Sequence, residues 1–301
     1  MEASFLENYL LRPESFWPKS HLRNADKVKR FVATGCAANG QNPKSYIDDI
    51  IKLGQLRKRF DNKHVYIVNP GSSGSHWIEA MLSLLADFHN GGEIYLPKDV
   101  KEYLSTLQLE DAEFFLDVVY LVHAGGIFDD SLTASLSNSA HLANHQQLSQ
   151  FSPNKRVVLL LRNPVDVVMS RTFRKDEYKK DIAPNSCDKE YLERNCSYVE
   201  KFYANINYDS FDSIIKYEDF ENQPLESLKA LADIIGLKAS DQNLMNAVNV
   251  TSRKAVKDSV SKGEQAMTNV YLGKHHEHAW AKDYTVKRLS YILNFHGMKF
   301  D

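Results

Sequence analysis

Cysteine is scarce in this chain of 301 residues, and long apolar runs are absent. The three cysteines, Cys36, Cys187 and Cys196, are irregularly spaced and form no Cys-x-x-Cys pair. This pattern argues against a disulfide framework and a zinc knuckle, so we expect no metal and a reducing, cytoplasmic location. No apolar stretch approaches the roughly 20 residues that cross a bilayer, and the N-terminus does not resemble a signal peptide. We therefore expect no membrane partner.

An excess of charge of either sign is also missing. Lysine and arginine total 37 against 39 acidic residues, which gives a formal net charge of −2. Global attraction to nucleic acid depends on a basic surface, so we expect no nucleic-acid partner. Any anion site in this protein must be local. The hydrophobic share of 43% is ordinary for a globular protein with a sizeable core.

Strand and helix patterns alternate along the chain. Apolar strands are expected at residues 65–68, 157–161 and 213–217. Helices are expected at residues 46–60, 97–109, 188–205, 224–235 and 284–295. A further helix is expected after the turn that follows the strand at 65–68, ending at about residue 88. Residues 114–122 fit either a buried strand or a core helix, and residues 127–140 indicate a loop. The alternation predicts an α/β fold with a central parallel sheet flanked by helices, in one domain over residues 1–301 with a helical lead-in over 1–60.

A glycine- and serine-rich turn follows the first expected strand. It reads Pro70-Gly71-Ser72-Ser73-Gly74-Ser75-His76-Trp77. Small residues let backbone amides approach an anion, and the helix start that follows favours negative charge. The Gly-Lys-Ser/Thr ending of a nucleoside-triphosphate P-loop is absent, because His76 and Trp77 stand there. Taken alone, the turn fits an ordinary loop as well as an anion site.

A second turn of this kind follows the strand at residues 157–161. Arg162 stands just past the strand, Pro164 suits the first position of a helix, and Ser170 lies about two turns further on. An arginine fork suits a dianionic phosphate, and strand ends carry ligand sites in open α/β sheets. The alternative is a structural ion pair between Arg162 and Asp166. Two such turns facing one crevice would grip both phosphate ends of a single nucleotide.

These segments resemble the sulfotransferase family in content and in order. Residues 70–77 resemble its 5′-phosphosulfate loop, usually Pro-Lys-Ser-Gly-Thr-Thr-Trp, and residues 162–170 resemble its 3′-phosphate motif. Three further segments are similar to the family's Tyr-Glu-Asp-Leu, Thr-Ser-Phe and closing Gly…Trp segments, namely Tyr217-Glu218-Asp219-Phe220, Thr251-Ser252-Arg253, and Gly273 with Trp280. The resemblance covers about residues 64–285.

The resemblance implies a P-loop-like sulfotransferase fold that binds 3′-phosphoadenosine 5′-phosphosulfate (PAPS). It implies transfer of the sulfuryl group to a hydroxyl or amine of a small-molecule acceptor. The residues that it implies for the nucleotide are Ser72, Ser73, Gly74, Ser75 and His76 at the 5′ end, Arg162 and Ser170 at the 3′-phosphate, Trp77 and Tyr217 at the adenine, and Thr251, Arg253, Gly273 and Lys274 from the later segments. Arg253 replaces an aromatic residue of the family, and a guanidinium plane also stacks on a base.

The resemblance also implies a histidine that accepts the acceptor's proton. In the cytosolic branch this base lies in a Lys-Thr-His-Leu segment, some twenty residues before the 3′-phosphate arginine. His141, in Ser139-Ala140-His141-Leu142, stands at nearly that distance and is the first choice. His123 is a rival because it ends an apolar run, and strand ends carry active sites in these sheets. Glu93 is third, since other branches use a glutamate there.

Two lysines of the family pattern are missing, because Ser72 and Ser139 stand in their places. A charge-assisted contact is worth about 1.5–3 kcal/mol, so an unreplaced loop lysine would reduce transfer more than nucleotide binding. A protonated His76, Lys63 or Lys274 would supply a replacement. The alternative to an active enzyme is therefore a non-catalytic nucleotide-binding protein of the same fold. A P-loop kinase ranks third, and the acceptor and the oligomeric state stay open.

Overall fold

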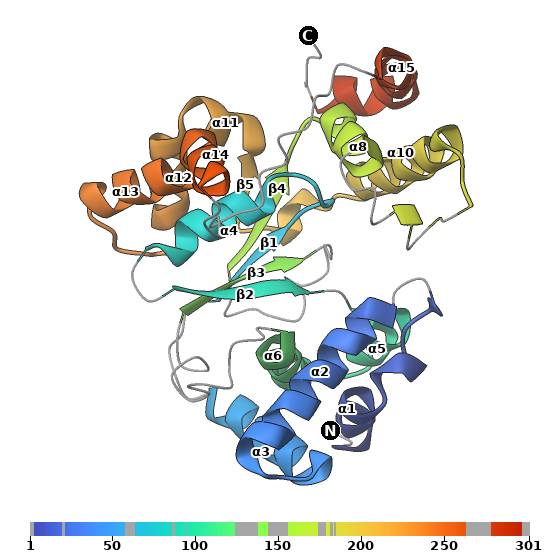
Figure 1. Cartoon of the computed structure of the whole chain (residues 1–301), viewed down its shortest axis with the longest axis vertical. Helices are drawn as coiled ribbons and strands as arrows, with labels where there is room; N and C mark the ends of the chain where they lie inside the picture. Colours follow the sequence, from blue (N-terminus) through green and yellow to red (C-terminus); the bar gives the residue numbers. More distant parts are fainter. Residues whose placement is uncertain are drawn as a thin grey trace. The chain divides into compact units, whose positions relative to one another are not determined.

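The computed structural model describes residues 3–19, 22–57, 64–85, 88–94, 96–123, 138–143, 156–173, 179–180, 183, 185–262 and 278–296 (Figure 1). Its contacts divide the chain into two compact units. Unit 1 is Met1–Ile67 with Leu82–Val157, and unit 2 is Val68–Met81 with Val158–Asp301. The single domain expected from the sequence stays a prediction. Within the described ranges, no helix combines the length and the apolarity needed to cross a membrane.

Five strands form the sheet in the order β2-β3-β1-β4-β5. They are β1 (His64–Val68), β2 (Phe88–Ile94), β3 (Asn138–Ala143), β4 (Arg156–Leu161) and β5 (Ser213–Lys216). β2 pairs with β3 in parallel, and so does β4 with β5. All of β4 after Arg156 is buried, as a strand covered on both faces requires. The predicted α/β fold with parallel strands is confirmed, and so are the three expected strands, except that Tyr217 already begins the next helix.

The helices of unit 1 confirm the helical lead-in where it is described. They are α1 (Ala3–Leu11), α2 (Leu22–Asn39), α3 (Pro43–Arg57), α5 (Lys98–Leu104) and α6 (Leu109–His123), with the 3₁₀ turn η1 (Pro13–Ser15). They lie together in Figure 1. The Phe5 ring stacks on Tyr103 at 3.8 Å between centroids, and Tyr9 and Phe115 are fully buried beside them. Burying a large apolar side chain is worth about 1.5–3 kcal/mol, so this cluster fastens α1 to α5 and α6.

Several elements of unit 1 differ from the sequence-based expectations. Residues 114–122, for which the sequence fitted either a strand or a helix, are helical, since they lie within α6. The helix expected to reach about 88 ends at Ser83, and Phe88 begins strand β2. Gly91 and Gly92, a pair of the kind that commonly ends a helix, are part of this strand. They lie in β2 where its register shifts, which is a common place for glycine in a strand.

Two further boundaries in unit 1 are corrected. The helix expected at 97–109 ends at Leu104, after starting beside Pro97. The loop expected at 127–140 contains the start of β3 at Asn138, while residues 124–137 lie outside the described residues. Asn-Ser-Ala-His-Leu-Ala has little intrinsic strand preference. Its pairing with β2 decides its conformation, as tertiary contacts commonly do for strands.

Unit 2 is mainly helical around β4 and β5. Its helices are α4 (Ser75–Ser83), α8 (Pro164–Phe173), α10 (Asp188–Ala204), α11 (Tyr217–Asn222), α12 (Pro224–Ile234), α13 (Asp241–Thr251), α14 (Arg253–Ser261) and α15 (Ala279–Phe295), with the 3₁₀ turn η4 (Tyr208–Ser210). The helices expected at 188–205, 224–235 and 284–295 are confirmed. α12 begins at Pro224 and closes at Gly236, whose φ is 67°. There the Leu237 N–H donates to the Ala232 carbonyl at 2.8 Å, which is the expected glycine closure.

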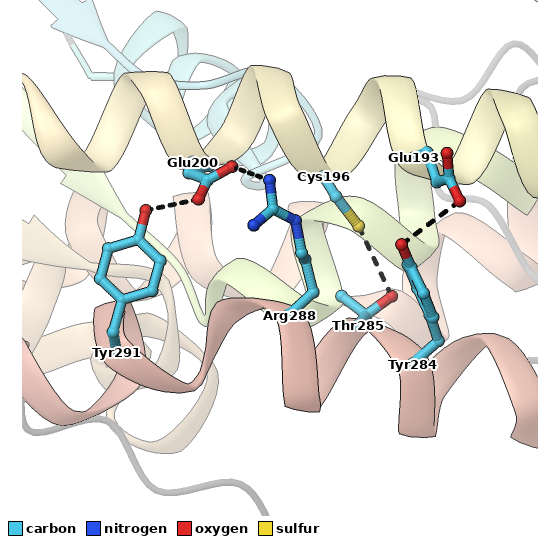
Figure 2. A network of polar contacts seen from close by, with 7 residues as sticks. All are labelled: Glu193, Cys196, Glu200, Tyr284, Thr285, Arg288 and Tyr291. Atoms are coloured by element: carbon cyan, nitrogen blue, oxygen red, sulfur yellow. Dashed lines mark hydrogen bonds and ion pairs between the residues drawn. The ribbon is translucent and has the colours of Figure 1, made fainter.

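A row of polar contacts joins α10 to α15 (Figure 2). The Glu200 carboxylate accepts hydrogen bonds from Arg288 at 2.6 Å and from Tyr291 at 2.8 Å, and Glu193 accepts one from Tyr284 at 3.3 Å. Residues three and four apart share a helix face, so one face of each helix supplies the row. α10 also carries side chains that reach the candidate site.

Candidate functional site

The Gly-Ser loop, residues 69–74, joins β1 to α4 and has an unusual backbone. Gly71, Ser72 and Gly74 have φ angles of 75°, 59° and 81°. Among the described residues Ser72 is the single non-glycine with a positive φ. Such a conformation is strained for residues with a side chain, and this strain concentrates at functional sites. The predicted turn between a strand and a helix is confirmed.

Two hydroxyl groups of the Gly-Ser loop are buried without a partner among the described residues. The side-chain oxygens of Ser72 and Ser73 have no hydrogen bond among the described residues, and Ser73 is 0% exposed. The N–H groups of Trp77 and Ile78 donate to the Gly74 carbonyl as α4 begins. The first N–H groups of an α-helix have no preceding helical carbonyl to bond to, and the helix dipole adds positive potential there. This combination of donors suits an anion.

Arg162 reaches the same loop from the end of β4. Its Nη1 donates to the Ser72 carbonyl at 2.9 Å, and its Cζ lies 4.4 Å from the centre of the Tyr217 ring. Its Nε is buried and has no acceptor among the described residues. Among the described residues no carboxylate pairs with Arg162, and Asp166 is exposed. A buried N–H without an acceptor is costly, so this geometry favours an anion over the alternative Asp166 pair.

Two residues from other helices hold the backbone where β4 ends. The Tyr203 hydroxyl on α10 donates to the Arg162 carbonyl and accepts from the Arg162 N–H at 3.3 Å. Glu218 on α11 accepts from the Asn163 N–H at 2.7 Å. Burial raises the pKa of Tyr203, so its hydroxyl stays a donor at neutral pH. The sequence-based reasoning missed both roles, although Glu218 stood within a matched segment.

Trp77 and Tyr217, which were expected at the adenine, lie in unit 2 in contact with Thr251 and Arg253 from the later segments. The Trp77 Nε1 donates to the Thr251 hydroxyl at 3.1 Å, and the Trp77 ring meets the Tyr217 ring edge-on at 6.0 Å. Arg253 donates to the Tyr217 hydroxyl at 2.9 Å and pairs with Glu221. Tyr217 thus contacts Trp77, Arg162 and Arg253. The contact of Trp77, Tyr217 and Arg253 with a base stays a prediction.

Gly74 is required where the loop passes the Tyr217 ring. A Cβ built on Gly74 would lie 2.3 Å from Tyr217 Cε2 and 2.4 Å from Cδ2. Its φ of 81° also disfavours any residue with a side chain. Close approach to the Tyr217 ring and backbone conformation therefore both select glycine at this position.

The two remaining polar residues of the motifs lie on helices. Ser170 is almost fully buried on α8, about two turns after Pro164, and its binding of a phosphate stays a prediction. His76 is half exposed in the first turn of α4, and its Nδ1 lies 3.3 Å from the Glu79 carboxylate. Glu79 is 2% exposed. Nothing in the sequence motifs pointed to this carboxylate.

The histidines expected as the base belong to unit 1. His141 lies in β3, next to β2, in which Glu93 stands opposite Leu142. His123 is the last residue of helix α6, so the argument that it ends a strand is wrong. Lys63, Gly273 and Lys274 lie outside the described residues. The described residues hold no group of three His, Cys, Asp or Glu side chains placed for a metal ion, and the expectation of no metal stays a prediction.

Comparisons with known proteins agree on one family. The sequence profile of the sulfotransferase domain matches residues 62–289. Sulfotransferase 2A2 of Rattus norvegicus is 25% identical over 165 residues, 49% of this chain and 58% of that protein. The match thus spans little more than half of that relative.

Solved structures of low identity are similar as well. A mouse sulfotransferase, SULT7A1, complexed with PAP, matches with a TM-score of 0.49 and 15% identity over 80% of this chain and 89% of that chain. Retinol dehydratase, in complex with androsterone and PAP, matches with a TM-score of 0.45 and 15% identity over 79% and 82%. The domain profile itself covers more than half of this sequence, including the Gly-Ser loop, Arg162 and Tyr217. The chain therefore belongs to the sulfotransferase family.

Proposed function

We propose that this protein binds PAPS and transfers its sulfuryl group to a hydroxyl or amine of a small-molecule acceptor. The observation that supports this most is a set of buried donors at one loop that have no partner among the described residues: the Arg162 Nε and the hydroxyls of Ser72 and Ser73. Phosphate and sulfate oxygens are acceptors of the kind these groups lack. Membership of the sulfotransferase family supports sulfuryl transfer in general.

In this proposal, different residues of unit 2 bind different parts of the nucleotide. Arg162 and Ser170 bind the 3′-phosphate. The amides and hydroxyls of residues 72–76 bind the 5′ end, at the start of α4. Trp77, Tyr217 and Thr251 line the adenine, and the Arg253 guanidinium stacks on it. Arg162 lacks a carboxylate partner among the described residues, which leaves its positive charge available to the ligand.

The chemistry requires a base and a cation. The acceptor oxygen or nitrogen bonds to sulfur while the bond from sulfur to the 5′-phosphate oxygen breaks, and the acceptor's proton passes to a base. His141 is the first choice for the base, and His123 and Glu93 are the alternatives. Positive charge on the leaving oxygen comes from His76 beside Glu79, or from Lys274 or Lys63. The Glu79 carboxylate lies 3.3 Å from the His76 Nδ1, so a protonated imidazole would form an ion pair at this place.

The second candidate is a nucleotide-binding protein without catalysis. Ser72 favours it, because the loop lysine of the family is missing there. Both functions predict binding of 3′-phosphoadenosine 5′-phosphate (PAP), the product of transfer. They differ in whether labelled sulfate reaches an acceptor.

A transfer assay separates the two. Purified protein is incubated with sulfur-labelled PAPS and a panel of hydroxyl and amine acceptors, and labelled products are resolved. We expect product from the wild type and about 10²–10⁴-fold less from His141→Ala, with unchanged PAP affinity. His89→Ala, on the neighbouring strand β2, is the matched control. PAP binding without any product would favour the second candidate, and absence of both would contradict both.

A further inference from the structure

A second arginine holds the Gly-Ser loop. Arg171, the residue after Ser170 on α8, donates through Nη1 to the Pro70 carbonyl at 3.0 Å. Its Nε donates to the Asn195 side chain at 3.3 Å, and its Cζ lies 4.2 Å from the centre of the Tyr198 ring. Among the described residues no carboxylate pairs with it. Within the described part of the chain, its charge therefore lies beside the loop without a compensating carboxylate.

Gly71 provides the space that Arg171 occupies. A Cβ built on Gly71 would lie 2.7 Å from the Arg171 Nη1, and the φ of Gly71 is 75°. The family's loop carries a lysine one residue later, where this chain has Ser72. In this chain the loop thus lacks the family's lysine, and the guanidinium of Arg171 on α8 lies against the loop instead.

The orientation of the Arg171 side chain is supported by the hydrogen bonds of Asn195, its partner on α10. Asn195 on α10 is 4% exposed and donates to the Thr172 hydroxyl at 3.1 Å. Thr172 in turn donates to the Val168 carbonyl at 2.8 Å. A planar guanidinium held at both ends loses little further freedom when a ligand binds. This support distinguishes Arg171 from a solvated surface arginine.

The two arginines orient alternate peptides of the loop. Arg171 holds the carbonyl of Pro70, and Arg162 holds that of Ser72. In a trans peptide the following N–H points opposite to the carbonyl, so the Ser73 N–H points away from Arg162. Fixed carbonyls therefore fix the direction of the amides that would bind an anion.

We propose that Arg171 is a positioning residue for the 5′ end of the nucleotide. It clamps the entry of the Gly-Ser loop and places there the positive charge that Ser72 does not supply. The inference rests on the proposed function, because it concerns the same nucleotide. It assigns Arg171 to the 5′-phosphate or phosphosulfate group and not to the 3′-phosphate.

Calorimetric titration with two ligands tests this assignment. PAP carries both phosphates, whereas adenosine 3′-monophosphate lacks the 5′-phosphate. We expect Arg171→Met to weaken PAP binding about tenfold or more while its affinity for adenosine 3′-monophosphate stays within about twofold of the wild type. Arg171→Lys should restore part of the preference for PAP, since it keeps the charge and loses the fork. A merely structural role would weaken both ligands alike.

Arg288→Met is the matched control. Like Arg171, which bonds to Asn195, Arg288 bonds to a side chain of α10, namely Glu200. Arg288→Met should leave both affinities unchanged. If the wild type fails to bind PAP, the proposed function is wrong. If it binds PAP and Arg171→Met keeps the wild-type ratio of affinities, only the inference about Arg171 is wrong. Should the methionine variant not fold, the ratio measured with Arg171→Lys decides in the same way.

Discussion

At the residue scale, the candidate site depends on groups that hold backbone as much as on groups that would touch a ligand. Arg162 and Arg171 each bind a carbonyl of the Gly-Ser loop. Tyr203 and Glu218 bind the backbone at the end of β4. Because an anion site needs donors in fixed directions, these holders set its geometry.

Tyr203→Phe tests this dependence. Loss of the hydroxyl leaves the N–H and the carbonyl of Arg162 without their bonds to Tyr203, which costs about 1–3 kcal/mol. We expect the free energy of unfolding to fall by that amount in urea denaturation, and PAP affinity to fall about tenfold. Tyr191→Phe removes a hydroxyl from the same helix and serves as the control. Unchanged stability and affinity for Tyr203→Phe would contradict the role.

Gly74→Ala should abolish measurable PAP binding. The added Cβ would collide with the Tyr217 ring at 2.3 Å, and the φ of 81° is strained for alanine. Gly40→Ala is the control, since Gly40 has a φ of 61° but nothing within 4 Å of the added Cβ. It should cost about 1 kcal/mol of stability and leave binding intact. Equal binding losses in both variants would show that strain alone, and not the Tyr217 contact, matters.

Residues within one contiguous motif could be predicted from the sequence, and their holders could not. The Gly-Ser loop and Arg162 stand in short segments with recognisable spacing. Tyr203 lies 41 residues after Arg162, and Arg171 lies 101 residues after the Pro70 carbonyl that it binds. Only the folded chain brings such residues together, and nothing in their local sequence marks them.

At the element scale, helices with strong end signals were predicted well. α8 and α12 begin at proline, and α12 closes at Gly236. β2 and β3 were missed for a physical reason. Gly91 and Gly92 mimic a break, and residues 138–143 form a strand only through pairing.

The contact between α10 and α15 allows an element-scale prediction. Arg288 is 45% exposed where it pairs with Glu200, so solvent screens this interaction. We expect a double-mutant cycle of Glu200→Gln and Arg288→Met to give a coupling energy below about 1 kcal/mol in urea denaturation. PAP affinity should not change. A coupling of several kcal/mol would contradict a screened contact.

At the scale of the whole molecule, a net charge of −2 coexists with local positive charge at one loop. Arg162 and Arg171 lack carboxylate partners among the described residues. Binding of an anionic nucleotide therefore depends on this local arrangement and not on the charge of the chain. The pH dependence of folding stability is also a property of the whole molecule.

His296 at the end of α15 should make the fold less stable in mild acid. Burial, with a smaller effect of Lys216, lowers the pKa of His296 below its ordinary 6.5, and its Nδ1 lies 2.6 Å from the Tyr208 hydroxyl. The unfolded chain thus takes up this proton first. The stabilisation that neutral His296 contributes is fully present above pH 6.5, the pKa in the unfolded chain. It is lost as the pH falls through the lower pKa of His296 in the folded protein. His296→Gln should reduce this loss in urea midpoints between about pH 8 and pH 5. An identical pH profile would contradict the assignment.

Calorimetric titration of PAP into the wild type and Arg162→Ala tests the central claim most directly. The claim is that Arg162 and the Gly-Ser loop bind a 3′-phosphoadenosine nucleotide. We predict that the wild type binds PAP and that Arg162→Ala weakens binding at least about tenfold, because a charged hydrogen bond is worth about 1.5–3 kcal/mol. A wild type that does not bind PAP, or an Arg162→Ala variant with wild-type affinity, would contradict the claim.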